Sequence, residues 1–105
     1  MIGRDEFALM KDGVILINTA RGAVVEEQAL VDALNERKLF GAGLDVFDSE
    51  PLGSCNVFKG FDNVILSPHI AGGTVESIVR MIESAGKNIA RVIEGKRPIN
   101  IVNEV

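Results

Sequence analysis

The sequence predicts an α/β protein built around a three-stranded parallel sheet. Residues 14–17 form a continuous apolar run rich in β-branched side chains, a pattern typical of a strand buried on both faces. Residues 41–47 and 63–67 repeat this apolar character. An amphipathic helix is expected over residues 26–37, so that strand, helix and strand form one crossover unit of the kind that joins parallel strands.

The helices are predicted from residue spacing and from their end residues. Over residues 26–37 the apolar side chains fall on one stripe, with acidic residues in the first turn and basic residues at the end, as the helix dipole prefers. Residues 4–11 indicate a short helix or the end of one. Residues 74–94 carry the longest helical repeat, which Thr74 can cap and Gly95 can end.

Composition and charge exclude several classes of function. The chain has 11 Lys and Arg against 15 Asp and Glu, a net charge of −4, so it has no basic surface for nucleic acid. No apolar stretch is long enough for a signal peptide or a membrane span, and we expect a soluble cytoplasmic protein with no membrane partner. Cys55 is the single cysteine and there is one histidine, so neither an internal disulfide nor a metal cluster is expected.

Polar side chains follow each of the three predicted strands. Arg21 follows the first, Asp45 and then Glu50 follow the second, and His69 follows the third. The carboxyl ends of parallel strands meet at one edge of a sheet, and open α/β sheets bind their ligands there. The sequence therefore predicts one site that combines a cation, carboxylates and the only histidine.

Each of these side chains has a functional and a plain structural interpretation. The guanidinium of Arg21 can bind a carboxylate with two parallel hydrogen bonds, or it can be an ordinary solvated side chain. His69 can transfer protons near neutral pH, a role in which a neighbouring Glu50 would favour its charged form, or it can make one satisfied hydrogen bond. Asp45 should bond to a specific partner, because an unpaired carboxylate in an apolar strand is costly.

Four motifs occur in order along the chain and carry a family resemblance. The motifs are Met-Lys-x-Gly at 10–13, Ile-Asn-Thr-Ala-Arg-Gly at 17–22, Gly-Ala-Gly-Leu-Asp-Val-Phe at 41–47 with Glu-Pro at 50–51, and Asn-Val-Ile-Leu-x-Pro-His-Ile-Ala-Gly at 63–72. In order and approximate spacing they resemble the C-terminal part of the D-isomer-specific 2-hydroxyacid dehydrogenases, the family that includes D-3-phosphoglycerate dehydrogenase and glyoxylate/hydroxypyruvate reductase. The resemblance covers essentially the whole chain.

The resemblance implies an oxidoreductase that moves a hydride between a nicotinamide coenzyme and a small 2-oxo or 2-hydroxy acid. In that family Arg21 would bind the substrate carboxylate and polarise its carbonyl, His69 would donate or accept the proton, and Glu50 would hold and tune His69. The coenzyme is expected to be NAD or NADP, because the position that reads the ribose is absent from this chain. The implied coenzyme contacts are Thr19, Ala20, Arg21, Asp45, His69, Ile70, Ala71 and Gly72.

The resemblance also implies a Rossmann-like domain organisation. Residues 1–73 would be the C-terminal half of an NAD-binding domain, and residues 74–105 a long helix and tail that return to the substrate domain. The chain contains no Gly-x-Gly-x-x-Gly turn to hold the pyrophosphate, so it resembles the last third of an enzyme. We therefore expect it to be inactive in isolation, to bind NAD weakly at best, and to self-associate as a homo-oligomer.

Two alternatives differ in function class or in branch of the family. A non-catalytic remnant or dimerisation module of the same fold, similar to the corepressors of the C-terminal-binding type, would need no complete coenzyme site. A formate dehydrogenase relative is disfavoured, because that branch typically has Gln where this sequence has Glu50.

Overall fold

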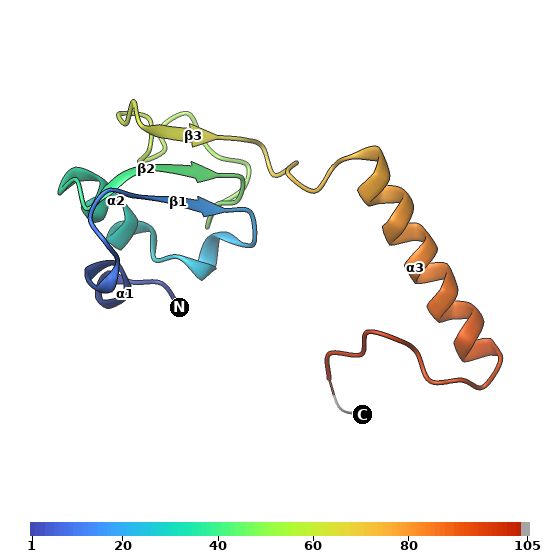
Figure 1. Ribbon diagram of the computed structural model, residues 1–105. Helices are drawn as coiled ribbons and strands as arrows, with labels where there is room; N and C mark the ends of the chain where they lie inside the picture. Colours follow the sequence, from blue (N-terminus) through green and yellow to red (C-terminus); the bar gives the residue numbers. More distant parts are fainter. Residues whose placement is uncertain (104–105) are drawn as a thin grey trace. The chain divides into compact units, whose positions relative to one another are not determined.

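The computed structural model describes residues 1–103 of the chain (Figure 1). The chain divides into two compact units, Met1–Ala71 and a second unit that begins at Gly72. Helices, one 3-10 turn and three strands form the first unit, while a long helix forms most of the second. In chain order the elements are α1 (Arg4–Leu9), β1 (Val14–Asn18), η1 (Gly22–Val24), α2 (Glu27–Asn35), β2 (Leu39–Leu44), β3 (Val64–Leu66) and α3 (Val75–Ile93).

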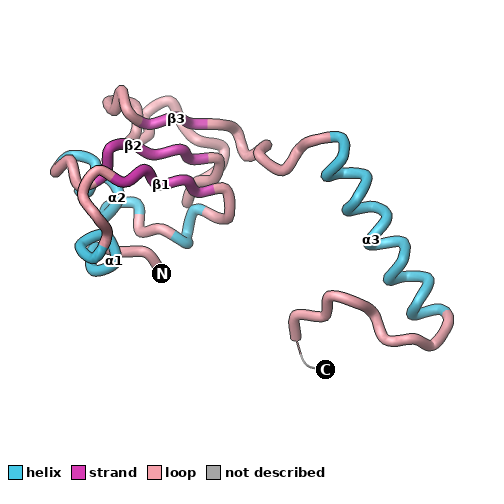
Figure 2. The backbone as a smooth tube through the Cα atoms, viewed as in Figure 1, coloured by secondary structure: helices cyan, strands magenta, loops and turns pink. Residues whose placement is uncertain are grey.

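The three strands form one sheet in the order β1-β2-β3, and both pairs are parallel (Figure 2). The residues in register at the carboxyl ends are Asn18 with Leu44 and Leu44 with Leu66, so the three strands end at one edge. α2 connects β1 to β2, as the amphipathic pattern predicts. The α/β fold class and its parallel three-stranded sheet are confirmed.

The hydrophobic core lies between the sheet and α2. The apolar stripe of α2 is buried, and its residues are 2–4% exposed. It packs on β2, where Leu39 is the most deeply buried side chain of the chain's described part. Burying one such leucine contributes roughly 1.5–3 kcal/mol. The core residues are Phe7, Val25, Ala29, Leu30, Ala33, Leu34, Leu39, Ala42, Leu44 and Phe58.

The prediction that the first strand is buried on both faces is wrong. Ile15 and Ile17 of β1, Phe40 of β2 and Ile65 of β3 are 63–77% exposed. They point to the face opposite the core, since side chains alternate along a strand. Within Met1–Ala71 the buried core packs on the other face only. An apolar run shows that a strand can be buried on both faces, but it does not show what covers each face.

The second strand lies two to three residues earlier than the sequence predicts. It begins at Leu39, which pairs with Val14 and is buried in the core, and it ends at Leu44. Asp45 consequently lies just past the strand rather than inside it. Its backbone N–H still donates to the carbonyl of Asn18, at 3.0 Å, which extends the contact between the two strand ends by one residue.

The second unit consists of α3 and the segment that follows it. The Thr74 hydroxyl oxygen accepts a hydrogen bond from the backbone N–H of Ser77 at 3.1 Å, and so caps α3 as predicted. Gly95 follows with a φ of +70°, the left-handed conformation that ends many helices. Among residues 1–103, no helix has the length and apolar character needed to cross a membrane.

Candidate active site

The loop after β1 is held in shape by Asn18. This side chain is 6% exposed, and it bonds to the backbone in both directions. Its Oδ1 accepts from the N–H of Ala20 at 3.1 Å, and its Nδ2 donates to the carbonyl of Arg21 at 3.0 Å. Thr19, Ala20 and Arg21 are exposed on this loop. Sequence reasoning missed Asn18, although an amide at the end of an apolar strand was a usable signal.

Asp45, after β2, is buried and fully engaged by protein donors. Its exposed fraction is 3%. Oδ1 accepts from the Ser67 hydroxyl at 2.6 Å and from the N–H of Ile70 at 3.0 Å, while Oδ2 accepts from the N–H of Ala71 at 2.9 Å. The Ser67 bond, followed by the bond from Ala71, holds the pKa of Asp45 below its usual value. Asp45 is therefore a carboxylate at neutral pH.

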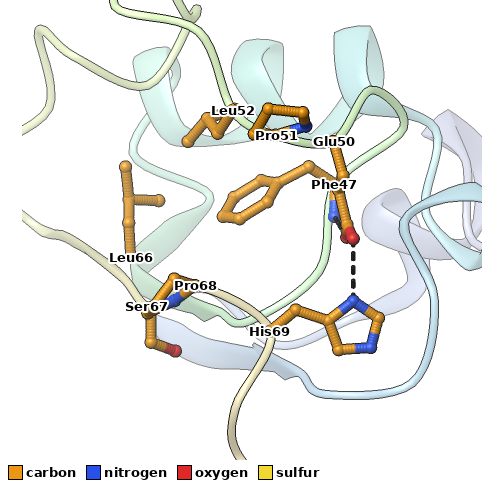
Figure 3. A pocket seen from close by; sticks show the side chains of 8 residues that line it. All are labelled: Phe47, Glu50, Pro51, Leu52, Leu66, Ser67, Pro68 and His69. Carbon is orange, nitrogen blue, oxygen red and sulfur yellow. Dashed lines mark hydrogen bonds and ion pairs between the residues drawn. The ribbon is translucent and has the colours of Figure 1, made fainter.

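His69, after β3, forms a hydrogen bond with Glu50. Its Nδ1 lies 2.8 Å from Oε2 of Glu50, the contact drawn as a dashed line in Figure 3. The second oxygen of Glu50 accepts from the N–H of Phe47 at 2.9 Å. The His69 bond, and then the Phe47 bond, lower the pKa of Glu50 from its usual range. An ionised carboxylate only accepts hydrogen bonds, so Nδ1 carries a proton and Nε2 is left for proton transfer.

The backbone of His69 adopts a conformation that is uncommon outside glycine. Its φ is +56°, in the left-handed region. Such conformations persist where the surrounding structure imposes them, and they cluster at functional sites. The side chain is 45% exposed, which leaves the ring open to a ligand.

A pocket of about 360 Å³ lies beside the His69–Glu50 pair. Its walls are mostly apolar, and Figure 3 shows the Phe47 ring between the Glu50 segment and the segment that leads to His69. The volume falls within the range of small-molecule sites, which combine apolar walls with a few polar groups. The lining residues are Phe47, Glu50, Pro51, Leu52, Leu66, Ser67, Pro68 and His69.

Arg21 lies near this pair but outside the pocket wall. Its guanidinium donates to the carbonyl of Ala20 at 2.6 Å. Its positive charge is the smallest of the causes that lower the pKa of Glu50, so it acts on the same edge of the sheet. The structure thus brings Glu50 and His69 into direct contact, with Arg21 at electrostatic range.

Gly22 joins the loop of Arg21 to the loop of Glu50. A methyl group added at Gly22 would overlap the carbonyl carbon and oxygen of Phe47 and the backbone nitrogen of Asp48. The two loops therefore touch through backbone atoms, which only glycine permits here. Sequence reasoning used Gly22 as part of a motif but missed this contact.

The described residues fit the nicotinamide end of a dinucleotide. Exposed Thr19 and Ala20 lie at the carboxyl edge of β1, and His69 lies beside a mostly apolar pocket at the same edge. Asp45, expected to contact the coenzyme, has both oxygens occupied by Ser67, Ile70 and Ala71. Gly72 belongs to the second unit. Residues 1–103 hold no group of three metal-ligating side chains.

A parallel α/β sheet with a histidine–carboxylate pair beside a pocket at its carboxyl edge is typical of a Rossmann-like domain. Within that class the family is shown by sequence. A family model for the "D-isomer specific 2-hydroxyacid dehydrogenase, NAD binding domain" matches residues 1–71. The chain therefore belongs to the D-isomer specific 2-hydroxyacid dehydrogenases, as the four motifs predict.

Individual relatives agree with this assignment. Over 104 residues the chain is 46% identical to a glyoxylate reductase of Thermofilum pendens and 48% identical to one of Thermococcus litoralis, and each match covers 99% of this chain and 31% of the relative. A crystal structure of a D-isomer specific 2-hydroxyacid dehydrogenase from Xanthobacter autotrophicus Py2, in complex with NADPH and MES, gives a TM-score of 0.85 at 33% identity, covering 97% of this chain and 41% of that one. The matched family model is described as NAD binding, and this neighbour was crystallised with NADPH. The chain spans about a third of the length of these curated relatives.

Proposed function

We propose that the chain is the proton-transferring segment of a reductase of small 2-oxo acids, with Arg21, Glu50 and His69 as its active residues. The observation that carries this proposal is the contact of 2.8 Å between Nδ1 of His69 and the Glu50 carboxylate, at the edge of a pocket. A histidine with one ring nitrogen fixed by a carboxylate presents its other nitrogen in a defined orientation, as general acid–base catalysis requires.

Each residue has a separate task in the proposed reaction. When bound, the coenzyme would supply a hydride to the carbonyl carbon of the 2-oxo acid. Nε2 of His69 donates the proton that the carbonyl oxygen takes up, and in the reverse direction it removes that proton. Glu50 orients the ring through its hydrogen bond to Nδ1. Arg21 binds the substrate carboxylate through its planar fork.

The names of the relatives support a small 2-oxo acid as the substrate, and the pocket has room for one. The two glyoxylate reductases act, by their names, on the smallest 2-oxo acid. We assign this chain to substrates of that kind, which a pocket of about 360 Å³ can admit. The division into residues 1–73 and 74–105, a homo-oligomeric state and a cytoplasmic location belong to the same proposal.

A chimeric enzyme tests the proposal. The chain replaces the matching 104-residue segment of the Thermococcus litoralis glyoxylate reductase, with which it is 48% identical. Oxidation of NADH and of NADPH is followed in the presence of glyoxylate, with the parent reductase as control. We expect kcat/KM within about tenfold of the parent. A folded chimera that binds coenzyme but does not turn over glyoxylate would contradict the proposal.

One observation favours a second, non-catalytic candidate, which is a dimerisation module. α3 has a helical stripe of large apolar side chains, 44–81% exposed, and a stripe of this kind promotes self-association. Sedimentation of the chain and turnover by the chimera test the module together: a dimer with an inactive chimera would favour the module, and an active chimera would favour the reductase. The stripe residues are Ile78, Ile82, Ile89 and Ile93.

A further inference from the structure

We propose that Ser67 is a positioning residue, which works with Asp45 to hold the His69 backbone so that the imidazole meets Glu50. The Asp45 clamp, as we call it, consists of the Asp45 carboxylate, the Ser67 hydroxyl and the backbone N–H groups of Ile70 and Ala71. The inference rests on the proposed function, which makes the position of His69 important for activity. The hydrogen bonds that support the inference involve neither substrate nor coenzyme.

The clamp bonds to the chain on both sides of His69. Ser67 precedes the histidine by two residues, and Ile70 and Ala71 follow it. All three donate to one carboxylate, at 2.6, 3.0 and 2.9 Å. The segment is therefore drawn around Asp45, and His69 occupies the bend with a φ of +56°. This arrangement supplies the constraint that a left-handed, non-glycine residue needs.

Ser67 is itself fixed to the sheet. Its backbone N–H donates to the carbonyl of Leu44, the last residue of β2, at 2.9 Å. Asp45 follows Leu44 directly, so backbone and side chain of Ser67 bond to consecutive residues. Figure 3 shows the Ser67 hydroxyl pointing away from Phe47 and Glu50, although the residue lines the pocket. The hydroxyl thus acts on the position of His69, through Asp45.

The charge of Asp45 strengthens the clamp. A carboxylate accepts several hydrogen bonds at once, and bonds to an ionised acceptor are shorter and stronger than neutral ones. The same bonds lower the pKa of Asp45. The clamp's contribution to folding stability is complete above the usual pKa range of Asp, and it is lost as the pH falls through the lowered pKa of Asp45. The clamp is intact at neutral pH.

Nuclear magnetic resonance of the 105-residue chain tests the inference without substrate. The Glu50 carboxyl carbon is titrated, because contact with His69 lowers the pKa of Glu50. His69→Asn gives the reference for complete loss of that contact, since Asn tolerates positive φ. Exchange rates of the Ile70 and Ala71 amides report the clamp itself. Ser54→Ala, in an exposed loop, is the matched control.

For Ser67→Ala we expect the Glu50 titration to move upward, toward that of the His69→Asn reference. We also expect exchange of the Ile70 amide to accelerate about fivefold, the effect of one lost hydrogen bond. Ser67→Thr, which keeps the hydroxyl, should restore both values, and Ser54→Ala should change neither. A merely structural serine would lower the melting temperature without moving the Glu50 titration.

Two results would overturn the inference. One is a folded Ser67→Ala chain whose Glu50 titration and Ile70 exchange match the unsubstituted chain. The second needs no variant. The amide chemical shifts of Ile70 and Ala71 should change with pH together with the Asp45 carboxyl. Amide shifts that change independently of the Asp45 titration would show that Asp45 does not hold these two amides. This second measurement decides the matter if Ser67→Ala does not fold. Neither result depends on glyoxylate turnover, so the proposed function can fail separately.

Discussion

Replacing Gly22 with alanine should uncouple the loop of Arg21 from the loop of Glu50. The added methyl would overlap the Phe47 carbonyl and the Asp48 nitrogen. Apolar carbon normally lies about 3.5–4.0 Å from its neighbours, so one loop must move by about 1 Å. A misplacement of that size can cost roughly 100-fold in rate. We therefore expect kcat/KM of the chimera for glyoxylate to fall about 100-fold in Gly22→Ala.

The assay compares Gly22→Ala with Gly53→Ala in the same chimera. A methyl on Gly53 meets no atom within 4 Å, and Gly53 has no positive φ, so this variant controls for the loss of a glycine. Overpacking should also destabilise Gly22→Ala by about 1–3 kcal/mol, measurable as a lower melting temperature. If Gly22→Ala and Gly53→Ala show the same kcat/KM and the same melting temperature, the two loops are not in contact as described.

Three further predictions concern the charged residues of the site and the activity of the isolated chain. Arg21→Lys in the chimera should lower kcat/KM by one to several orders of magnitude, because a point charge replaces a bidentate fork; unchanged kinetics with glyoxylate would remove Arg21 from the mechanism. Glu50→Gln should lower kcat/KM for glyoxylate, because His69 then loses the ionised partner that fixes its ring; unchanged kinetics would show that Glu50 does not position His69. The isolated chain should show no dehydrogenase activity and should bind NAD weakly, and it should form a dimer or larger oligomer through α3. Micromolar NAD affinity, or a clean monomer in sedimentation, would contradict this prediction.

Local pattern was sufficient to predict the architecture. The apolar runs and the stripe of α2 determine which segments pair and which side of the helix is buried, because both depend on residue spacing alone. Parallel pairing then places Arg21, Asp45, Glu50 and His69 at one edge. The error on the exposed face of β1 has the same origin, since spacing reports what a strand can bury and not what is present to cover it.

Contacts between loops could not be predicted in this way. The positive φ of His69, the hydroxyl of Ser67 on Asp45 and the backbone contact at Gly22 each depend on residues far apart in sequence. A serine before a proline carries no signal for a buried carboxylate more than twenty positions earlier. These groups meet only because of the path that the backbone takes after the ends of β2 and β3. The residues were visible in the sequence, but their partners were not.

The central claim is that His69 transfers the proton in glyoxylate reduction, and kcat/KM of the chimera carrying His69→Asn tests it most directly. Asn tolerates the left-handed backbone at this position, so the fold should be kept. Loss of a general acid predicts a fall in kcat/KM of roughly 10²–10⁴ with the melting temperature unchanged. A His69→Asn chimera that reduces glyoxylate as fast as the unsubstituted chimera would contradict the claim.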